Sequence, residues 1–234
     1  MTRRRTWWVA VAAVLAVLVA VQVNTGQSPG RFVAQAEIPT VIPGTDILAG
    51  VPEVPGRLRG NDYRRAAFGE SWTDDTDAPG GRNGCDTRND ILERDLVDKT
   101  YVSISRCPTA VATGTLHDPY TNATVAFVRG NQIGASVQID HLVPLALAWD
   151  LGARHWTDHL RARFANDPAN LIAVSGAANQ DKGDDTPAEW MPPNRAFWCQ
   201  YAVQFSAVLR GYGLPVDTRS AVTLRDAAAT CPTG

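Results

Sequence analysis

Asp140-His141-Leu142-Val143-Pro144 places an acid and a histidine at the end of a short apolar run, and it is followed by Asn170-Leu171 and Asn179-Gln180-Asp181-Lys182-Gly183. A carboxylate and an amide can hold a hard divalent ion through oxygen. A neighbouring neutral imidazole can take a proton from water. The three stretches together therefore predict a hydrolytic metal site, and phosphodiester hydrolysis is a reaction that such a site supports.

Residue type assigns a first set of roles within this pattern. Asp140 can supply an anionic oxygen and Asn179 a neutral one, which leaves positions for water and a substrate phosphate. Oxygen ligands with one negative charge suit Mg²⁺ or Mn²⁺ better than Zn²⁺. His141, with an unperturbed pKa of about 6.5, is expected to accept the proton. Because side chains alternate along a strand, a bend after the strand is needed to bring Asp140 and His141 into one cleft.

Hydrophobic periodicity and turn residues predict short strands and helices in alternation. Strands are expected at 101–106, 110–116, 124–129, 137–139 and 170–174. Helices are expected at 86–96, 146–149, 158–164, 195–209 and 218–229, with a turn or short helix over 179–182. The predicted fold class is therefore α+β, with a small hairpin framed by helices and further short strands.

The same stretches resemble a known nuclease motif. D-H-L-V-P at 140–144, N-L-I-A-V-S at 170–175 and N-Q-D-K at 179–182 are similar to the HNH, or ββα-metal, motif with Asn as the last metal ligand. A similar D-H-I-V-P…N…N-x-x-K pattern occurs in the HNH domain of RNA-guided nucleases. The wider context from A-W-D-L-G-A at 148–153 to P-A-E-W-M-P-P-N at 187–194 resembles the C-terminal nuclease domain of GmrSD-type restriction enzymes and their secreted actinobacterial relatives. This likeness covers about 85–231.

The resemblance implies a ββα-metal fold and a specific division of roles. Asp140 and Asn179 would bind one divalent metal, and His141 would be the general base for the attacking water. Asn170 would hold the loop and orient the base through hydrogen bonds, and Lys182 would touch a phosphate. The implied products carry 5′-phosphate and 3′-hydroxyl ends. Zinc-binding HNH members use His as metal ligands, so their metal preference is not transferred to this chain.

Other polar residues near the motif have two possible explanations. Three arginines are the best local candidates for a phosphate-contacting face, and a solvated helix face explains them equally well: Arg154, Arg161 and Arg163. His155 and His159 have the i, i+4 spacing that can bind zinc on a helix. A surface helix explains this pair better, because no H-E-x-x-H motif is present.

The N-terminal residues have the layout of an export segment. Three arginines at 3–5 precede an almost uninterrupted apolar run at 7–23, and Ala34-Gln35-Ala36 offers a cleavage site. This layout predicts a signal peptide over 1–36, with a retained membrane anchor as the alternative. Both alternatives export the remainder of the chain, so the protein is expected to be secreted or anchored outside the cytoplasm.

The rest of the chain divides into a tether and one domain. Residues 37–56 are rich in Pro and Gly and lack periodicity, which predicts a tether. Residues 57–234 are then expected to form the nuclease domain. Membrane contact is expected only through the possible N-terminal anchor, and no protein partner is evident.

Cysteine usage agrees with export. The four cysteines all follow the apolar run and form no C-x-x-C pair, which argues against a zinc knuckle. Two disulfides are expected in an exported chain. Three pairings are possible, and we favour Cys85–Cys107 with Cys199–Cys231 because each would close a short loop.

Charge constrains the function that the sequence supports. Residues 1–36 hold four Arg and no acid, so the remainder has 18 basic and 24 acidic residues. Proteins that bind duplex nucleic acid mainly by neutralising phosphates are usually basic. A nuclease acting on DNA therefore needs the metal and a local basic patch. The alternatives are a non-catalytic module that binds extracellular DNA on an HNH fold, and a secreted hydrolase of another class.

Overall fold

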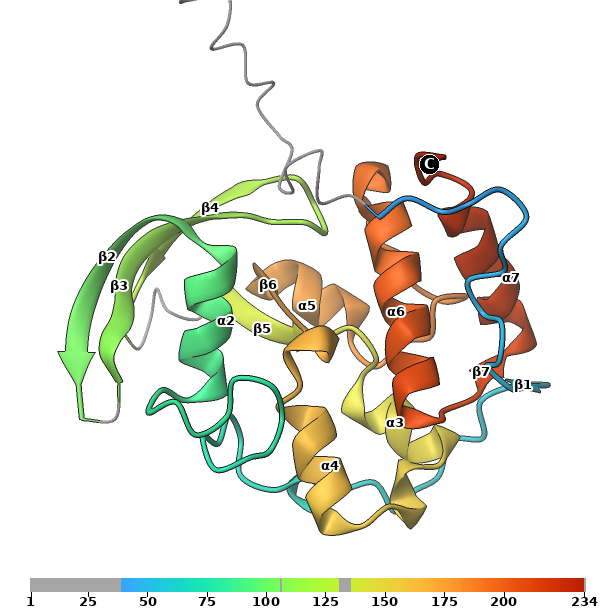
Figure 1. Cartoon of the computed structure of the whole chain (residues 1–234), viewed down its shortest axis with the longest axis horizontal. Helices are drawn as coiled ribbons and strands as arrows, with labels where there is room; N and C mark the ends of the chain where they lie inside the picture. Colours follow the sequence, from blue (N-terminus) through green and yellow to red (C-terminus); the bar gives the residue numbers. More distant parts are fainter. Residues whose placement is uncertain (1–38, 106, 131–135, 234) are drawn as a thin grey trace, which may run out of the picture. The chain divides into compact units, whose positions relative to one another are not determined.

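The computed structural model describes residues 39–105, 107–130 and 136–233, which have a mixed α+β architecture (Figure 1). The strands are β1 Glu53–Val54, β2 Val97–Ile104, β3 Cys107–His117, β4 Thr124–Val128, β5 Val137–His141, β6 Leu171–Ser175 and β7 Val216–Asp217. The described helices are α2 Thr87–Asp95, α3 Leu145–Leu151, α4 Asp158–Ala165, α5 Gly176–Lys182, α6 Trp198–Tyr212 and α7 Thr218–Ala228. Short 3₁₀ turns occupy Arg65–Phe68, Ala153–His155, Pro168–Asn170 and Arg195–Phe197.

β5, β6 and α5 form a hairpin-and-helix unit around the predicted site. The two strands are antiparallel, with Asp140 opposite Ile172 and His141 opposite Leu171. α5 follows β6 directly, and Ser175 caps it by accepting a hydrogen bond from the N–H of Ala178. α3 and α4 lie in the connection between the strands. The strand expected at 137–139 therefore extends through both residues of the Asp-His pair.

The hairpin is buried on both of its faces, and each face belongs to a different apolar cluster. Leu171 and Ala173 of β6 pack with residues of α2, β3 and β4 in one cluster. Ile172 and Val174 pack with residues of α3, α6 and α7 in the other. This assignment follows from the two-residue period of a strand. Because both faces are covered, the end of β5 is held on a rigid support.

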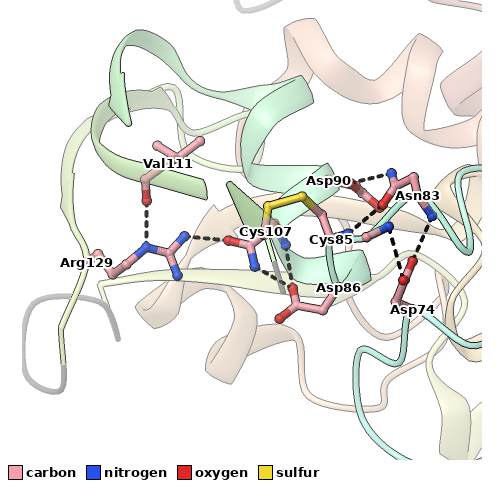
Figure 2. Close-up of a disulfide and its surroundings, with 10 residues drawn as sticks. Asp74, Asn83, Cys85, Asp86, Asp90, Cys107, Val111 and Arg129 are labelled. Atoms are coloured by element: carbon pink, nitrogen blue, oxygen red, sulfur yellow. Dashed lines mark hydrogen bonds between the residues drawn. A yellow bond between two sulfur atoms is a disulfide. The ribbon is translucent and has the colours of Figure 1, made fainter. Parts of the chain in front are cut away.

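β2, β3 and β4 form a separate antiparallel sheet next to α2 (Figure 1). Asp86 caps α2 by accepting a hydrogen bond from the N–H of Asn89. The expected disulfide between Cys85 and Cys107 is confirmed, and it ties the residue before this cap to the start of β3 (Figure 2).

α6 and α7 pack against each other at the C-terminal end of the described chain (Figure 1). The helix expected at 195–209 begins with a 3₁₀ turn and continues as α6 to Tyr212. The second expected disulfide, Cys199–Cys231, is also confirmed and joins α6 to the segment after α7. The favoured cysteine pairing is thus the observed one.

The described part of segment 37–56 packs against the domain, which corrects the tether expected there. Ile47, Leu48 and Val51 are buried in the same cluster as α6 and α7. β1 also pairs in parallel with β7, where Glu53 lies opposite Val216. Proline and glycine remove the periodicity by which a packed element is recognised in a sequence. The few apolar side chains of this segment are nevertheless buried, because they pack against distant helices of the folded domain.

No helix within the described ranges is long and apolar enough to cross a membrane. The apolar run at 7–23 and the proposed cleavage site at 34–36 lie outside the described residues. The choice between a signal peptide and an anchor therefore stays a prediction.

Candidate active site

A cavity of about 610 Å³ lies at the end of β5 and contains the central residues of the sequence motif. Asp140, His141 and Asn179 all line this cavity. His141 is the last residue of β5, and the chain turns away from the hairpin after it. The bend expected after a strand at 137–139 is therefore wrong: the strand continues through both residues of the pair, and the chain bends only at 142–143.

Asp140 is an almost buried carboxylate with partners on both oxygens. The Tyr120 hydroxyl donates a hydrogen bond to Oδ2 over 2.6 Å. The Lys182 ammonium lies 2.9 Å from Oδ2 and 3.2 Å from Oδ1. Burial, with the negative charge of Asp140, raises the pKa of Tyr120 well above its ordinary value, so Tyr120 remains a donor. A carboxylate has about four lone-pair positions, so these partners leave Asp140 capacity for a further ligand.

Lys182 is not placed to touch a substrate phosphate, which corrects the expectation from the resemblance. Its side chain is 0% exposed. Besides pairing with Asp140, the ammonium donates a hydrogen bond to the backbone carbonyl of His141 over 2.9 Å. Lys182 is the last residue of α5, and its ammonium points inward to Asp140. A buried carboxylate is costly unless it is paired with an opposite charge, and Lys182 provides that charge.

His141 has one ring nitrogen fixed by the backbone. Nε2 lies 2.9 Å from the carbonyl oxygen of Ala165, so Nε2 carries the proton and donates. The neutral ring then has Nδ1 as its acceptor. Burial, together with the positive charges of Arg65 and Lys182, lowers the pKa of His141 to about 3. The ring is therefore unprotonated at neutral pH, and a proton acceptor is available in the cavity.

Asn170 is fully buried and fastens the loop that follows His141. Its side-chain Oδ1 accepts a hydrogen bond from the Val143 N–H over 2.8 Å, and its Nδ2 donates to the Val143 carbonyl over 3.2 Å. Its backbone carbonyl accepts from the Leu142 N–H over 2.8 Å. These three bonds hold the first residues after His141 against the 3₁₀ turn before β6. Asn170 does not line the cavity.

Asn179 and Asp140 provide the oxygen atoms that suit a hard divalent ion. The Asn179 amide nitrogen donates to the side chain of Gln138 over 2.8 Å. This bond assigns the amide orientation and leaves Oδ1 as the free acceptor. No group of three His, Cys, Asp or Glu side chains in the described ranges could hold a metal. One carboxylate and one amide fit an ion that keeps several waters, as Mg²⁺ does.

The three arginines expected as phosphate contacts do not line the cavity. Arg161 is buried and donates to the carbonyls of Ala67, Ala153 and Trp156, which is a structural role. Arg154 pairs with Asp62 and Asp150, and Arg163 pairs with Asp77. His155 and His159 are exposed, and His159 lies 3.5 Å from Asp77. His155 ends the 3₁₀ turn Ala153–His155 whereas His159 lies in α4, so the two histidines do not share the one surface helix that was expected.

Other residues complete the walls of the cavity without having been singled out in the sequence. Arg65, Arg88 and Trp72 line it, and Trp72 stacks on His141 with a ring separation of 5.6 Å and an interplanar angle of 13°. Arg65 and Trp72 come from a polar segment without periodicity, and Tyr120 comes from a turn. For the segment that contains Arg65 and Trp72, the one signal in the sequence was a tryptophan within a loop rich in Gly and Asp.

This geometry defines a hairpin-and-helix domain with an acid, a histidine and an amide in one cavity. Residues 86–226 match the family described as GmrSD restriction endonucleases, C-terminal domain. Because this match covers more than half of the chain, the protein belongs to that family. Membership implies an HNH-like fold, nuclease activity, a metal and a DNA substrate.

One curated relative adds information on location. An "Uncharacterized secreted protein" of Arthroderma benhamiae is 38% identical over 150 residues, which are 63% of this chain and 68% of that protein. The relative is named as secreted, and two disulfides are consistent with an extracellular location. No solved structure matches the chain.

Proposed function

We propose that the protein is an exported, metal-dependent endonuclease that hydrolyses phosphodiester bonds of DNA with His141 as general base. The observation that carries this proposal is the single cavity lined by the Asp140 carboxylate, the His141 imidazole and the Asn179 amide. Family membership supplies the class of reaction. The disulfides and the secreted relative support export.

The residues present fit one divalent ion of the Mg²⁺ or Mn²⁺ type, held by Asp140 and Asn179. Such an ion, when bound, stabilises negative charge on the phosphate oxygens and on the departing alkoxide. The protein provides the remaining functions. Lys182 and Tyr120 hold the Asp140 carboxylate in place, and Gln138 keeps the Asn179 oxygen available.

His141 takes the proton of the attacking water at Nδ1. The Ala165 carbonyl accepts the Nε2 proton throughout, so it orients the ring and stabilises the imidazolium that forms. Water oxygen bonds to phosphorus while the bond from phosphorus to the 3′ oxygen breaks; the 3′ oxygen takes up a proton from solvent water, and the His141 imidazolium releases its proton to solvent. The products are a 5′-phosphate and a 3′-hydroxyl. Asn170 acts through the backbone of Leu142 and Val143 and keeps His141 at the edge of the cavity.

Metal removal tests the proposal directly. EDTA is expected to abolish cleavage of plasmid DNA, and an excess of Mg²⁺ or Mn²⁺ is expected to restore it, because the proposed reaction needs the ion to stabilise charge on the phosphate and on the leaving oxygen. Gel analysis measures cleavage, and end-labelling of the products identifies the 5′-phosphate. Asn179→Ala is expected to need a higher Mg²⁺ concentration for half-maximal activity, whereas the exposed control Asn61→Ala is not. Cleavage that is indifferent to EDTA would contradict the metal-dependent mechanism.

Arg65 is expected to contact a substrate phosphate. It is exposed, lines the cavity and forms no ion pair with other described residues. Losing one charged hydrogen bond is expected to raise KM for DNA by about tenfold in Arg65→Ala. It is also expected to reduce the slope of log KM against log salt by about one.

Arg163→Ala is the control for Arg65, because Arg163 is a partly exposed arginine that pairs with Asp77 outside the cavity. Steady-state kinetics at several salt concentrations compare the two variants with the unmodified protein. An equal rise of KM in both variants would mean that the effect is general surface charge and not a contact in the cavity.

A further inference from the structure

We propose that Trp72 is a positioning residue that fixes the plane of the His141 ring. This inference rests on the proposed role of His141 as general base. Trp72 lies outside residues 86–226, the range that matches the family, so family membership does not account for it. The indole lies against the imidazole with a ring separation of 5.6 Å and an interplanar angle of 13°.

A single hydrogen bond is not enough to orient an imidazole. The bond from Nε2 to the Ala165 carbonyl fixes the direction of one ring atom, but the ring can still tilt about that bond. A flat aromatic face against the ring removes this freedom. Trp72 provides the face, and its other contacts are with the apolar cluster that contains Ile139 and Leu171. The two contacts together define where Nδ1 lies in the cavity.

The backbone of Trp72 is itself held in an unfavourable conformation. Its φ of 60° lies in the left-handed region, which bulky side chains rarely adopt. Such conformations persist where the surroundings impose them, and they concentrate at functional sites. Here the Trp72 carbonyl accepts a hydrogen bond from the Thr87 N–H over 3.3 Å. The loop conformation is therefore set by contacts with the start of α2.

The loop that carries Trp72 is closed by its own contacts and by a disulfide. Asp74 accepts hydrogen bonds from the backbone N–H groups of Asn83 and Gly84 over 3.0 and 3.1 Å. The Cys85–Cys107 disulfide follows immediately and ties the end of the loop to β3 (Figure 2). These links make the loop a stable support for an aromatic side chain.

Both supports of the His141 ring converge on Thr87. The Thr87 hydroxyl lies 3.1 Å from the Thr73 carbonyl, next to Trp72, and 3.0 Å from Oδ1 of Asn166. Asn166 directly follows Ala165, whose carbonyl holds Nε2. The stacking face and the hydrogen-bond acceptor are thus joined through one buried residue, which keeps their relative position constant.

The test compares Trp72→Phe with Trp72→Leu in the full chain. Both side chains are apolar, but only phenylalanine keeps a flat face. Trp72→Leu is expected to lower kcat by roughly 10- to 100-fold with little change in KM, because small displacements of a reacting group have effects of this size. Trp72→Phe is expected to stay close to the unmodified protein. Trp198→Leu, outside the cavity, is the control for loss of a tryptophan.

A second measurement does not depend on nuclease activity. Diethyl pyrocarbonate labels accessible neutral histidines, and mass spectrometry locates the label. The exposed His155 and His159 serve as internal references. Relative to them, labelling of the almost buried His141 is expected to rise roughly 3- to 10-fold in Trp72→Leu, which corresponds to the loss of one stacked pair. It is expected to stay low in Trp72→Phe.

Three outcomes would overturn this proposal. A rise of KM at constant kcat would show that Trp72 contacts substrate instead of positioning His141. Equal kinetics of the Phe and Leu variants would show that only apolar packing is needed. Unchanged His141 labelling in Trp72→Leu would show that the stack does not restrain the ring. If the unmodified protein cleaves no nucleic acid, the proposed function fails, while labelling still supports or overturns the restraint on the ring.

Discussion

Replacing His141 with alanine is expected to lower kcat for DNA cleavage by about 10²- to 10⁴-fold, the usual contribution of a general base. The ring is unprotonated at neutral pH because burial lowers its pKa to about 3. Its Nε2 is committed to the Ala165 carbonyl, so Nδ1 is the nitrogen that can accept a proton. No other histidine of the described chain lines the cavity. KM is expected to change little.

The matched control is His159→Ala, which removes an imidazole that is 72% exposed. Its activity is expected to equal that of the unmodified protein. Plasmid nicking at saturating Mg²⁺ gives kcat for both variants, and circular dichroism checks that each is folded. Added imidazole is expected to restore part of the activity of His141→Gly, because the cavity is large enough to admit it. Full activity of His141→Ala would refute the assignment of the base.

Local sequence patterns predicted the elements that build the site more closely than their bounds. The strand expected at 137–139 continues to His141, and the turn or short helix expected at 179–182 is the last part of α5, which begins at Gly176. Of the motif residues, Asp140, His141 and Asn179 line one cavity, whereas Asn170 does not line it. Periodicity and cap residues predict a helix or strand because both depend only on residues within or next to that element.

The features that the sequence did not predict depend on contacts between distant segments. Lys182 looked like a free cation next to a ligand, but its partner is a carboxylate 42 residues earlier. Arg161 looked like part of a basic surface, but its guanidinium holds three carbonyl groups. Trp72 lies in a loop without periodicity, and only the folded chain brings it to His141. The charge or aromatic character of a residue does not predict which distant side chain or carbonyl group it will contact in the folded protein.

Replacing Lys182 with methionine is expected to lower the free energy of unfolding of the metal-free protein by about 3–5 kcal/mol. This is the usual result of removing one partner from a buried ion pair, because the remaining charge is left uncompensated. Lys182 is 0% exposed, and among the described residues Asp140 would keep only the Tyr120 hydroxyl as a side-chain partner. Urea denaturation at neutral pH in EDTA measures the change.

Two further variants separate charge from packing. Lys99→Met removes the other lysine of the chain, which pairs with Glu93 at the surface, and is expected to cost less than about 1 kcal/mol. Asp140→Asn/Lys182→Met removes both charges and is expected to be more stable than Lys182→Met alone. If the double variant were no more stable, the loss would come from packing of the lysine stem. A recovery in the double variant would mean that the loss in Lys182→Met comes from the unbalanced charge of Asp140, so that Lys182 balances this metal ligand before any cation binds.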